Sequence, residues 1–484
     1  MRLPKIFGNF FKNEKNIILL LLTWIISLSL AYSVLSVVRH NHFESGGFDL
    51  GIYDQGTYLL SRGDLNPFST IKGRLLFGDH LSLTLPLISP IFYIWNDVRF
   101  LLIFQAFFIS FSTIPIYFMA RGRKLRPFSS LIFSIIYSLF FGIQYAVYFD
   151  WHAIVIAVGI LAWLIYFYES KKLKLFIISL ILFILTQENT GLGLASIGFV
   201  YLFKKENRKH AIIFILGGVF VSLVEARIIA HLSPIGYEYF PHYPLNPITL
   251  FKRYFDSPDK ILVWKYALSS YSFLPLLSPG AMMGTFFDLA QYFLPDKQFP
   301  HMITPYFHHR AILTPILGLG VLDAIILLKK KINEEILLII VLLIVCFFQF
   351  KYHHALNKLT KPIYFTNYSW MKDNEKIISE VPDGDSVTAQ QSLVPHLSHR
   401  KEIYLAWPRQ KQDLKKCGET VPCWWLDFDG KPKYLIVDLH EGATLTQLLE
   451  SRENFIKALE NMENAGKITL YKSENNAKIY KINY

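Results

Sequence analysis

The chain of 484 residues is 52% hydrophobic and only 18% charged, with 41 phenylalanines and a formal net charge of +12. An ordinary soluble protein of this length carries more charge, so the composition excludes that class. The basic residues stand in short clusters between apolar runs. This pattern is typical of membrane orientation, and we therefore predict no nucleic-acid partner.

Apolar runs long enough to form membrane helices recur along the first 350 residues. The first run is too long for the core of a signal peptide and lacks a clear cleavage site, which predicts a retained anchor. About eleven crossings are expected, at 16–38, 99–119, 127–148, 152–168, 175–187, 190–203, 211–230, 261–278, 280–294, 311–328 and 336–350. The pair at 175–187 and 190–203 is short, which predicts tilted or re-entrant helices. The proline-interrupted segment 81–95 predicts a helix lying along the outer surface.

Five basic clusters set the predicted orientation of these crossings. They are "MRLPKIFGNFFKNEK" at the N-terminus, "RGRKLR" at 121–126, "ESKKLK" at 169–174, "KKENRKH" at 204–210 and "KKKINEE" at 329–335. Cytoplasmic loops are enriched in Lys and Arg, which puts all five clusters in the cytoplasm. We therefore predict a multi-pass protein of the cytoplasmic (inner) membrane, with its N-terminus inside and its C-terminus outside.

The composition changes near residue 370 to that of a soluble domain, predicted at 371–484. "DSVTAQ", "IYLAW", "YLIVDL" and "KITLYK" have the pattern of strands, "TLTQLLESRENFIKALENMEN" that of an amphipathic helix, and the last residues that of a hairpin. This alternation favours a small α/β layer domain. Cys417 and Cys423 are predicted to form a disulfide outside the cytoplasm, with free thiols as the alternative.

Five groups of polar residues fall on the predicted outer face. They are Asp49 with Asp54, His80, Asp150 with His152, Gln187 with Glu188, and His308 with His309 and Arg310. A single polar turn is usually only solvated, but charged groups close to the hydrocarbon are costly and tend to be functional. The short helices around Glu188 place this carboxylate below the membrane surface. We therefore predict that these groups contribute to a site.

Several motifs carry a resemblance to known membrane proteins. "FDLGIYDQ" and "GDHLSLTLPLISPIFYIW" follow the anchor, and "FDWHA", "QENTGL", "HHRAILTPILGLG" and "SLVPHLSHRKEIYLAW" occur further along. Together they resemble a prokaryotic family of predicted membrane proteins of unknown function, allied to the GT-C superfamily of polytopic membrane glycosyltransferases. The resemblance implies a polytopic α-helical membrane protein. The implied protein has a GT-C-like domain at 1–370 with a first outer loop at 39–98, followed by a small extracytoplasmic α/β domain.

By analogy, the resemblance implies inverting transfer of a sugar from a polyprenyl-phosphate donor to a glycan, lipid or protein acceptor. Asp49 would be the catalytic base, because lipid-phosphate-sugar enzymes of this superfamily place a catalytic Asp in the first outer loop. Arg310, with Lys252 or Arg253, would bind the leaving phosphate, and the other polar residues would bind the substrate. Many relatives carry Asp-x-Asp or Glu-x-Asp, whereas here Asp54 follows five positions later. This spacing does not establish a metal-binding pair, and a divalent cation (Mg²⁺ or Mn²⁺) is left open.

The surroundings of Asp49 predict a loop folded back over the membrane surface. Gly46, Gly47 and Gly51 are expected to allow unusual backbone conformations and the close approach of a ligand. Phe48 and Tyr53 are expected to wedge the loop at the interface. The aromatic segment "HLSPIGYEYFPHYPLNPITLFKRYF" is expected to cover the donor.

Two other classes of function remain open. A transporter or flippase for a lipid-linked saccharide would use the same polar groups for binding. Transporters usually hold such groups near the bilayer midplane between repeated halves, and no repeat is evident in this chain. A non-catalytic membrane scaffold with an outer binding domain would leave Asp49 and Glu188 unexplained.

Overall fold

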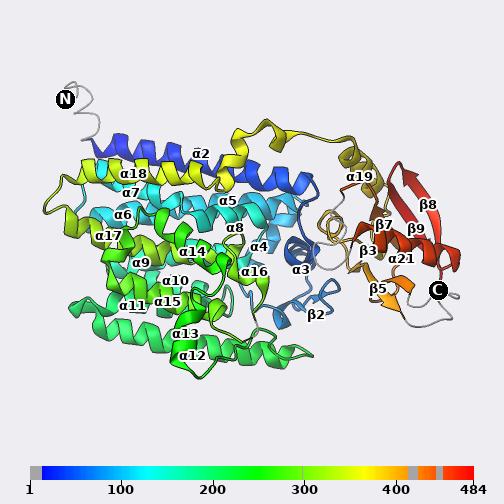
Figure 1. Ribbon diagram of the computed structural model, residues 1–484, viewed down its shortest axis with the longest axis horizontal. Coiled ribbons are helices and arrows are strands. Elements are labelled where there is room, and N and C mark those ends of the chain that lie inside the picture. Colours follow the sequence, from blue (N-terminus) through cyan, green and yellow to red (C-terminus); the bar gives the residue numbers. More distant parts are fainter. Residues whose placement is uncertain (1–12, 297, 412–422, 443–450) are drawn as a thin grey trace. The chain divides into compact units, whose positions relative to one another are not determined.

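The computed structural model describes residues 13–296, 298–411, 423–442 and 451–484, and the chain divides into two compact units. The first unit comprises Met1–Ser36, His80–Thr84 and Leu102–Lys361. The second comprises Val37–Asp79, Leu85–Leu101 and Pro362–Tyr484 (Figure 1). Most of the predicted first outer loop therefore belongs to the same unit as the C-terminal domain.

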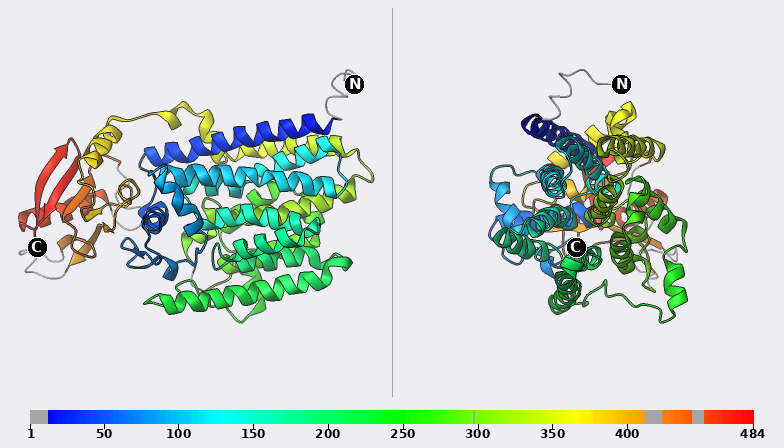
Figure 2. Two further views of the ribbon diagram at one scale, coloured as in Figure 1. Left: turned by 180° about the vertical axis from the view of Figure 1, so that it is seen from behind. Right: turned by 90° about the vertical axis from the view of Figure 1, so that its left-hand side faces the viewer.

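The first unit is a bundle of helices that run alongside one another (Figure 2). Its helices, some of which begin or end in the second unit, are α2 (Glu14–Asn41), α5 (Arg99–Phe111), α6 (Thr113–Gly122), α7 (Pro127–Ser138), α8 (Phe141–Phe149), α9 (Ala153–Glu169), α10 (Leu173–Ile184), α11 (Thr190–Leu202), α12 (Arg208–Leu232), α13 (Pro247–Arg253), α14 (Pro258–Ser269), α15 (Pro279–Phe293), α16 (Pro300–Ile303), α17 (Leu313–Leu328) and α18 (Glu334–Lys351). Short turns of helix join them: η4 (Lys205–Asn207), η5 (Leu274–Leu277), η6 (His308–Arg310) and η7 (Ala355–Thr360). Each apolar run that the sequence assigns to a crossing folds as a helix or as a broken pair of helices.

Three helices in the described part of the chain are long and apolar enough to cross a membrane: Glu14–Asn41, Arg99–Gly122 and Lys205–Leu232. Two bent pairs raise the number to five if each pair is one broken span. These pairs are Pro127–Ser138 with Phe141–Phe149, bent by 46°, and Pro300–Arg310 with Leu313–Leu328, bent by 64°. The protein therefore has membrane helices, and the larger count of about eleven crossings stays a prediction. Helix α10 has 12 residues and α11 has 13, so each is about 18–20 Å long.

Glycines bring the backbones of α11, α12 and α15 into contact. A Cβ built on Gly191 or Gly218 would overlap with the carbonyl oxygen of the other residue. A Cβ on Gly284 would collide in the same way with the carbonyl of Ser196. Small residues at helix contacts are typical of packing inside membranes, where close backbone approach replaces the hydrophobic effect. This packing fixes the first turn of α11, and with it Glu188, against α12.

The segment after α2 contributes short elements to the second unit. They are η1 (Gly47–Gly51), α3 (Ile52–Ser61), β1 (Phe68–Ser69), β2 (Arg74–Leu75), η2 (Leu76–Gly78), α4 (Leu85–Ile88) and η3 (Ser89–Tyr93). The continuous helix predicted at 81–95 is wrong, because this stretch forms only the two short turns α4 and η3. Pro86 and Pro90 lack the backbone N–H groups that a longer helix needs.

The C-terminal part of the second unit is built on a five-stranded sheet in the order β4-β3-β7-β9-β8. Its elements are η8 (Pro362–Phe365), α19 (Ser369–Ser379), β3 (Val387–Ala389), η9 (Val394–His396), β4 (Ile403–Leu405), β5 (Trp407–Lys411), β6 (Cys423–Asp427), β7 (Tyr434–Asp438), α21 (Arg452–Asn464), β8 (Ile468–Glu474) and β9 (Ala477–Ile482). Each of the four predicted strand segments contains a strand, and β8 and β9 form the predicted hairpin. The antiparallel pair of β5 and β6 was not predicted. Helix α21 matches the second part of the predicted amphipathic helix, whose residues 444–450 lie outside the described residues.

Two helices cover opposite faces of this sheet. Leu435 and Val437 of β7 pack with Phe455 and Leu459 of α21 in one apolar core. Successive side chains of a strand point to opposite faces, so Asp438 lies on the other face. There its carboxylate accepts a hydrogen bond from Asn374 of α19 (2.7 Å). The domain is therefore a helix–sheet–helix sandwich, as the α/β pattern predicts.

Candidate functional site

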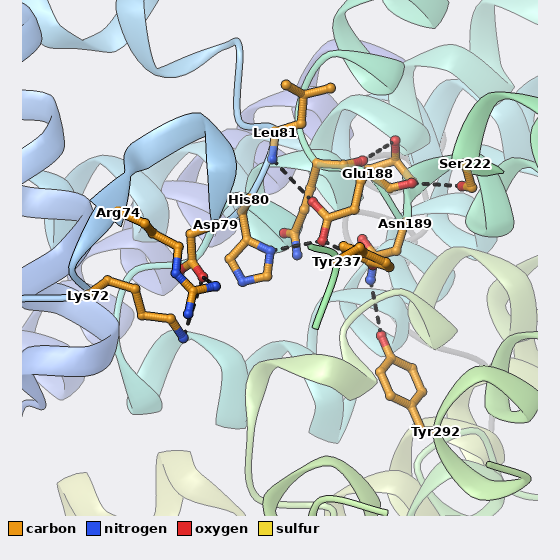
Figure 3. Close-up of polar contacts among 12 residues, drawn as sticks. Lys72, Arg74, Asp79, His80, Leu81, Glu188, Asn189, Ser222, Tyr237 and Tyr292 are labelled. Carbon is orange, nitrogen blue, oxygen red and sulfur yellow. Dashed lines mark hydrogen bonds and ion pairs between the residues drawn. The ribbon is translucent and has the colours of Figure 1, made fainter. Parts of the chain in front are cut away.

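A buried carboxylate, Glu188, lies in the turn between α10 and α11 and is only 3% exposed. Its Oε1 is 2.8 Å from Nδ1 of His80, and its Oε2 accepts a hydrogen bond from the Leu81 backbone N–H at 3.3 Å (Figure 3). The hydroxyl of Ser222, on α12, donates to the Glu188 carbonyl oxygen at 2.7 Å. The side chain is therefore held in one position by its contacts with His80 and Leu81.

The aromatic segment after α12 contacts this carboxylate–imidazole pair. The hydroxyl of Tyr237 lies 3.5 Å from Glu188 Oε1, and the ring of Tyr239 stacks on His80 with centroids 5.5 Å apart. Burial, together with the Glu188 carboxylate, raises the pKa of Tyr237 well above its ordinary value, so this hydroxyl stays protonated. This segment contacts Glu188 and His80, and the cover over a donor that the sequence suggests stays a prediction. Arg253, from the same segment, instead pairs with Asp296 (2.7 Å).

A second polar group gathers three histidines. The ring of His308 stacks on His152 with centroids 3.5 Å apart and on His309 at 4.0 Å. The side-chain amide of Gln105 fixes the turn that carries His152, because it donates to the Asp150 carbonyl and accepts from the His152 N–H, both at 2.9 Å. Asp150 itself is 1% exposed. The Nδ1 atoms of His308 and His309 are buried without a hydrogen-bond partner.

Arg310 follows these histidines and is fully buried. Its guanidinium lies over the ring of Tyr292 (4.6 Å) and donates through Nη2 to the Met302 carbonyl. Among the described residues, its Nε and Nη1 have no hydrogen-bond partner, and neither has Oδ2 of the buried Asp288. Leaving a buried charge without full hydrogen bonding is costly, and folded proteins rarely do so without a function. These open donors indicate a place prepared for an anionic ligand.

Tyr292 joins the two groups. Its hydroxyl pairs with the side-chain amide of Asn189 at 3.3 Å, and its ring contacts both Arg310 and His309. We refer to the whole set as the polar cluster. It consists of His80, His152, Glu188, Asn189, Tyr292, His308, His309 and Arg310. Gln187 borders it, with its Oε1 buried and without a partner.

The sequence predicted most of the polar cluster but missed its member Tyr292 and two neighbouring residues, Asp288 and Gln105. All three lie inside apolar runs that were assigned to crossings. An ionisable residue within an apolar run is itself a functional signal, and Asp288 carries it. Tyr292 and Gln105 gave no comparable signal.

Asp49 and Asp54 lie in the second unit. Asp49 is half-buried in η1, a single π-helical turn, a rare conformation that often occurs at functional sites. Gly47 and Gly51 do not adopt a positive φ, so the unusual conformations predicted for them are wrong. These glycines are needed for space instead, since a Cβ on either would lie 3.0 Å from the Val394 side chain.

Asp54 is buried at the start of α3 and is used within the fold. One oxygen accepts from the Ser398 hydroxyl (2.5 Å) and the other lies 3.0 Å from His399 Nε2. This geometry does not support the substrate-binding role predicted for Asp54. Phe48 contacts the ring of Trp407 (5.2 Å), so it too packs within the second unit.

The pair of Asp54 and His399 predicts a pH-dependent stability. Burial opposes the charged imidazole, but the Asp54 carboxylate outweighs it and raises the pKa of His399 above its ordinary value. An unfolded histidine titrates near pH 6.5, at about its ordinary value. The contribution of the pair to the free energy of unfolding is therefore complete below about pH 6.5 and is lost as pH rises through the folded pKa. Thermal unfolding of the purified chain should show this loss, and Asp54→Asn should abolish it. An unchanged pH profile in Asp54→Asn would contradict the assignment.

Cys423, at the start of β6, is disulfide-bonded. Its predicted partner Cys417 lies outside the described residues. Cys346, on α18, is a free cysteine.

No group of three or more His, Cys, Asp or Glu side chains in the described ranges is arranged to hold a metal ion. The divalent cation that the sequence left open therefore stays a prediction. We propose no metal-dependent step.

The family described as "Predicted membrane protein (DUF2079)" matches residues 39–451. The chain belongs to this family. Its membership agrees with the apolar helices and establishes a membrane protein. The match includes both Asp49 and the polar cluster, as well as most of the C-terminal domain. No curated protein matches the chain.

Proposed function

We propose that this member of the family is a GT-C-like membrane glycosyltransferase that transfers a sugar, with inversion, from a polyprenyl-phosphate donor to an extracytoplasmic acceptor. The observation that carries the proposal is the buried Arg310, whose Nε and Nη1 have no partner beside three stacked imidazoles. An apolar bundle has no structural need for such a group. A ligand that brings both a lipid tail and a phosphate explains it.

The chemistry divides among these residues as follows. Arg310 and the neighbouring histidines receive the phosphate, and charge-assisted hydrogen bonds stabilise it as it leaves the sugar. Glu188, oriented by His80, accepts hydrogen bonds from the sugar hydroxyls. Asp49, in the second unit, is the base that the family resemblance implies for the proton of the acceptor hydroxyl. In the transfer the acceptor oxygen bonds to the anomeric carbon, its proton goes to the base, and the bond between that carbon and the phosphate oxygen breaks.

A groove on α12 supports a lipid-linked ligand. It has a volume of about 570 Å³ and is lined by Phe220, Leu223, Val224, Arg227, Ile228, His231 and Leu232. The neighbouring face of the same helix carries Ser222, which bonds the Glu188 backbone. The apolar side chains of the groove suit a prenyl chain.

The proposal includes the membrane topology predicted from the sequence: about eleven crossings of the cytoplasmic membrane, with the C-terminal domain outside. A reporter that is active only outside the cytoplasm, fused after Tyr484, should be active, and one fused after Lys331 should not. The physical reason is the retention of Lys and Arg clusters on the cytoplasmic side. Activity of a cytoplasm-only reporter after Tyr484 would refute this topology.

The activity is tested by transfer from a panel of radiolabelled polyprenyl-phosphate sugars in membranes that contain the chain. Matched membranes with the Arg310→Met variant are the control. We expect a labelled product from at least one donor, formed only in the first sample. If no donor yields product in either sample, or if both yield the same amount, the proposal fails.

A transporter of lipid-linked saccharides is the second candidate. The observation that favours it is the 64° bend between Pro300–Arg310 and Leu313–Leu328, which lies at the polar cluster. Broken helices at a polar site are typical of transporters. Movement of a fluorescent lipid-linked sugar across proteoliposomes, without product formation, would favour this candidate.

A further inference from the structure

The second unit contains a polar site of its own, at the carboxyl ends of β3 and β7. The strands β4, β3 and β7 are parallel, and β3 lies between the other two. The chain passes from β3 to β4 on one side and later to β7 on the other side. Ligands of such sheets bind outside the carboxyl ends of the strands, at the point where the strand order reverses. That point is the boundary between β3 and β7.

A carboxylate–imidazole pair occupies this boundary. Asp438, the last residue of β7, has an oxygen 2.6 Å from Nδ1 of His440 and accepts from Asn374 Nδ2 at 2.7 Å. The His440 backbone N–H also donates to Asp438 at 3.1 Å. A carboxylate that binds one ring nitrogen fixes the orientation of the imidazole and leaves Nε2 for another partner.

Aromatic rings line the same place. The ring of His440 stacks on Trp370 with centroids 3.9 Å apart, and Trp370 contacts Phe43 at 6.0 Å. Phe43 in turn contacts His396 at 4.3 Å. Burial lowers the pKa of His396 to about 3, so this imidazole is uncharged at neutral pH.

Asn374 Oδ1, Gln391 Oε1 and His396 Nε2 are buried here without a hydrogen-bond partner in the described part of the chain. The two glutamines that follow β3, Gln390 and Gln391, connect these residues to the loop that carries Asp49. Gln390 accepts from the Asp438 N–H at 2.8 Å, and the Gln391 carbonyl accepts from the Gly47 N–H at 3.0 Å. One turn of chain thus holds both the Asp438–His440 pair and the segment that carries Asp49.

The charges at this place suit a neutral ligand. The cations around these residues have partners of their own: Arg99, whose charge acts on His396, pairs with Asp97 at 2.9 Å. Arg452 and Arg400 donate to backbone carbonyls at Leu439 and Leu397. A phosphate would need a cation with open donors, as Arg310 offers in the first unit. Carboxylate, amide and imidazole groups beside aromatic rings instead match hydroxyl groups, which both donate and accept, and the apolar faces of sugar rings.

We propose that the strand-end site, formed by Trp370, Asn374, Gln391, His396, Asp438 and His440, binds a neutral, hydroxyl-rich carbohydrate. This carbohydrate is the acceptor of the transfer, an identification that rests on the proposed function, whereas the binding itself does not. His440 Nε2 and the open amide oxygens bond to its hydroxyl groups. The neighbouring η1 turn brings Asp49 to the same segment of the unit.

The test uses the purified full-length chain, labelled with a fluorophore in detergent, on an array of immobilised oligosaccharides. We expect the wild type to bind a defined subset of them. His440→Gln removes the imidazole with its oriented Nε2 and its stacking on Trp370, so this variant should bind these oligosaccharides about tenfold more weakly. Glu380→Gln, which removes only a surface ion pair with Lys472, is the matched control and should bind normally.

Absence of binding by the wild type, or equal binding by His440→Gln, overturns the proposal. If His440→Gln does not fold, hydrogen exchange of the wild type with and without a bound array oligosaccharide decides instead. Protection of residues 434–440 supports the site, and protection confined to other segments overturns it. Neither readout needs sugar transfer, so a failed transfer assay and a failed binding assay remain distinguishable.

Discussion

Replacing Arg310 with methionine is expected to lower kcat/KM for the polyprenyl-phosphate donor by about 10²–10³, the usual effect of removing one group that stabilises developing charge. The guanidinium is fully buried, and two of its donors have no partner. A ligand phosphate would complete its hydrogen bonds. Methionine fills similar space beside Tyr292 but cannot bind the phosphate.

The stability of the same variant separates function from structure. A buried charge with incomplete hydrogen bonding costs free energy, which Arg310→Met removes. A buried carboxyl such as Asp288 that loses a nearby cation takes up a proton instead of staying charged. We therefore expect the unfolding temperature of Arg310→Met to stay the same or rise while activity falls. A large drop in unfolding temperature would instead mean that Arg310 stabilises the fold through its contacts with Tyr292 and Met302.

The matched control is Arg126→Met. Arg126 precedes α7, and its side chain is 60% exposed beside Glu335. Exposed ion pairs contribute little, so this change should leave both activity and stability close to those of the wild type. An equal loss in the two variants would show that the assay responds to net charge and not to a phosphate site.

The sequence predicted helices well, because each predicted crossing is an apolar run whose backbone polar groups must pair within the segment. It also predicted the strands of the C-terminal sheet from alternation alone. The β5–β6 pair was missed because apolar and polar residues do not alternate regularly in "WPRQK", and the second residue of this strand is a proline. The proline-interrupted helix predicted at 81–95 is shorter than expected, because the helical turns α4 and η3 cover only residues 85–93.

The candidate site divides in the same way. His80 and Glu188 were predicted to share one membrane face, and the fold pairs them at 2.8 Å. The burial of Asp54 could not be predicted, because its partner His399 lies 345 positions later. The Asp438–His440 pair was missed for a related reason. An acid at the end of a strand and a histidine two residues later resemble an ordinary polar turn until the order of the strands in the sheet is known.

Replacing Asp49 with asparagine is the second change with a large expected effect. Loss of a positioned base typically costs about 10²–10⁴ in rate, so transfer should fall by this factor. Asparagine has nearly the shape of aspartate but no basic oxygen. Because Asp49 is half-buried in the single turn η1, the variant should insert and unfold like the wild type.

Two neighbouring acids provide the controls for Asp49. Asp64 accepts only a local turn bond from the Asn66 N–H (3.1 Å), so Asp64→Asn should change neither activity nor stability. Asp54→Asn should lower stability, because Ser398 and His399 lose their partner, and a well-folded fraction should keep most of its activity. If Asp49→Asn retained full transfer, or if it behaved like Asp54→Asn, the base assignment would be wrong. The η1 turn would then serve to anchor α3 on the loop that follows β3, where Gly47 and Gly51 pack against Val394.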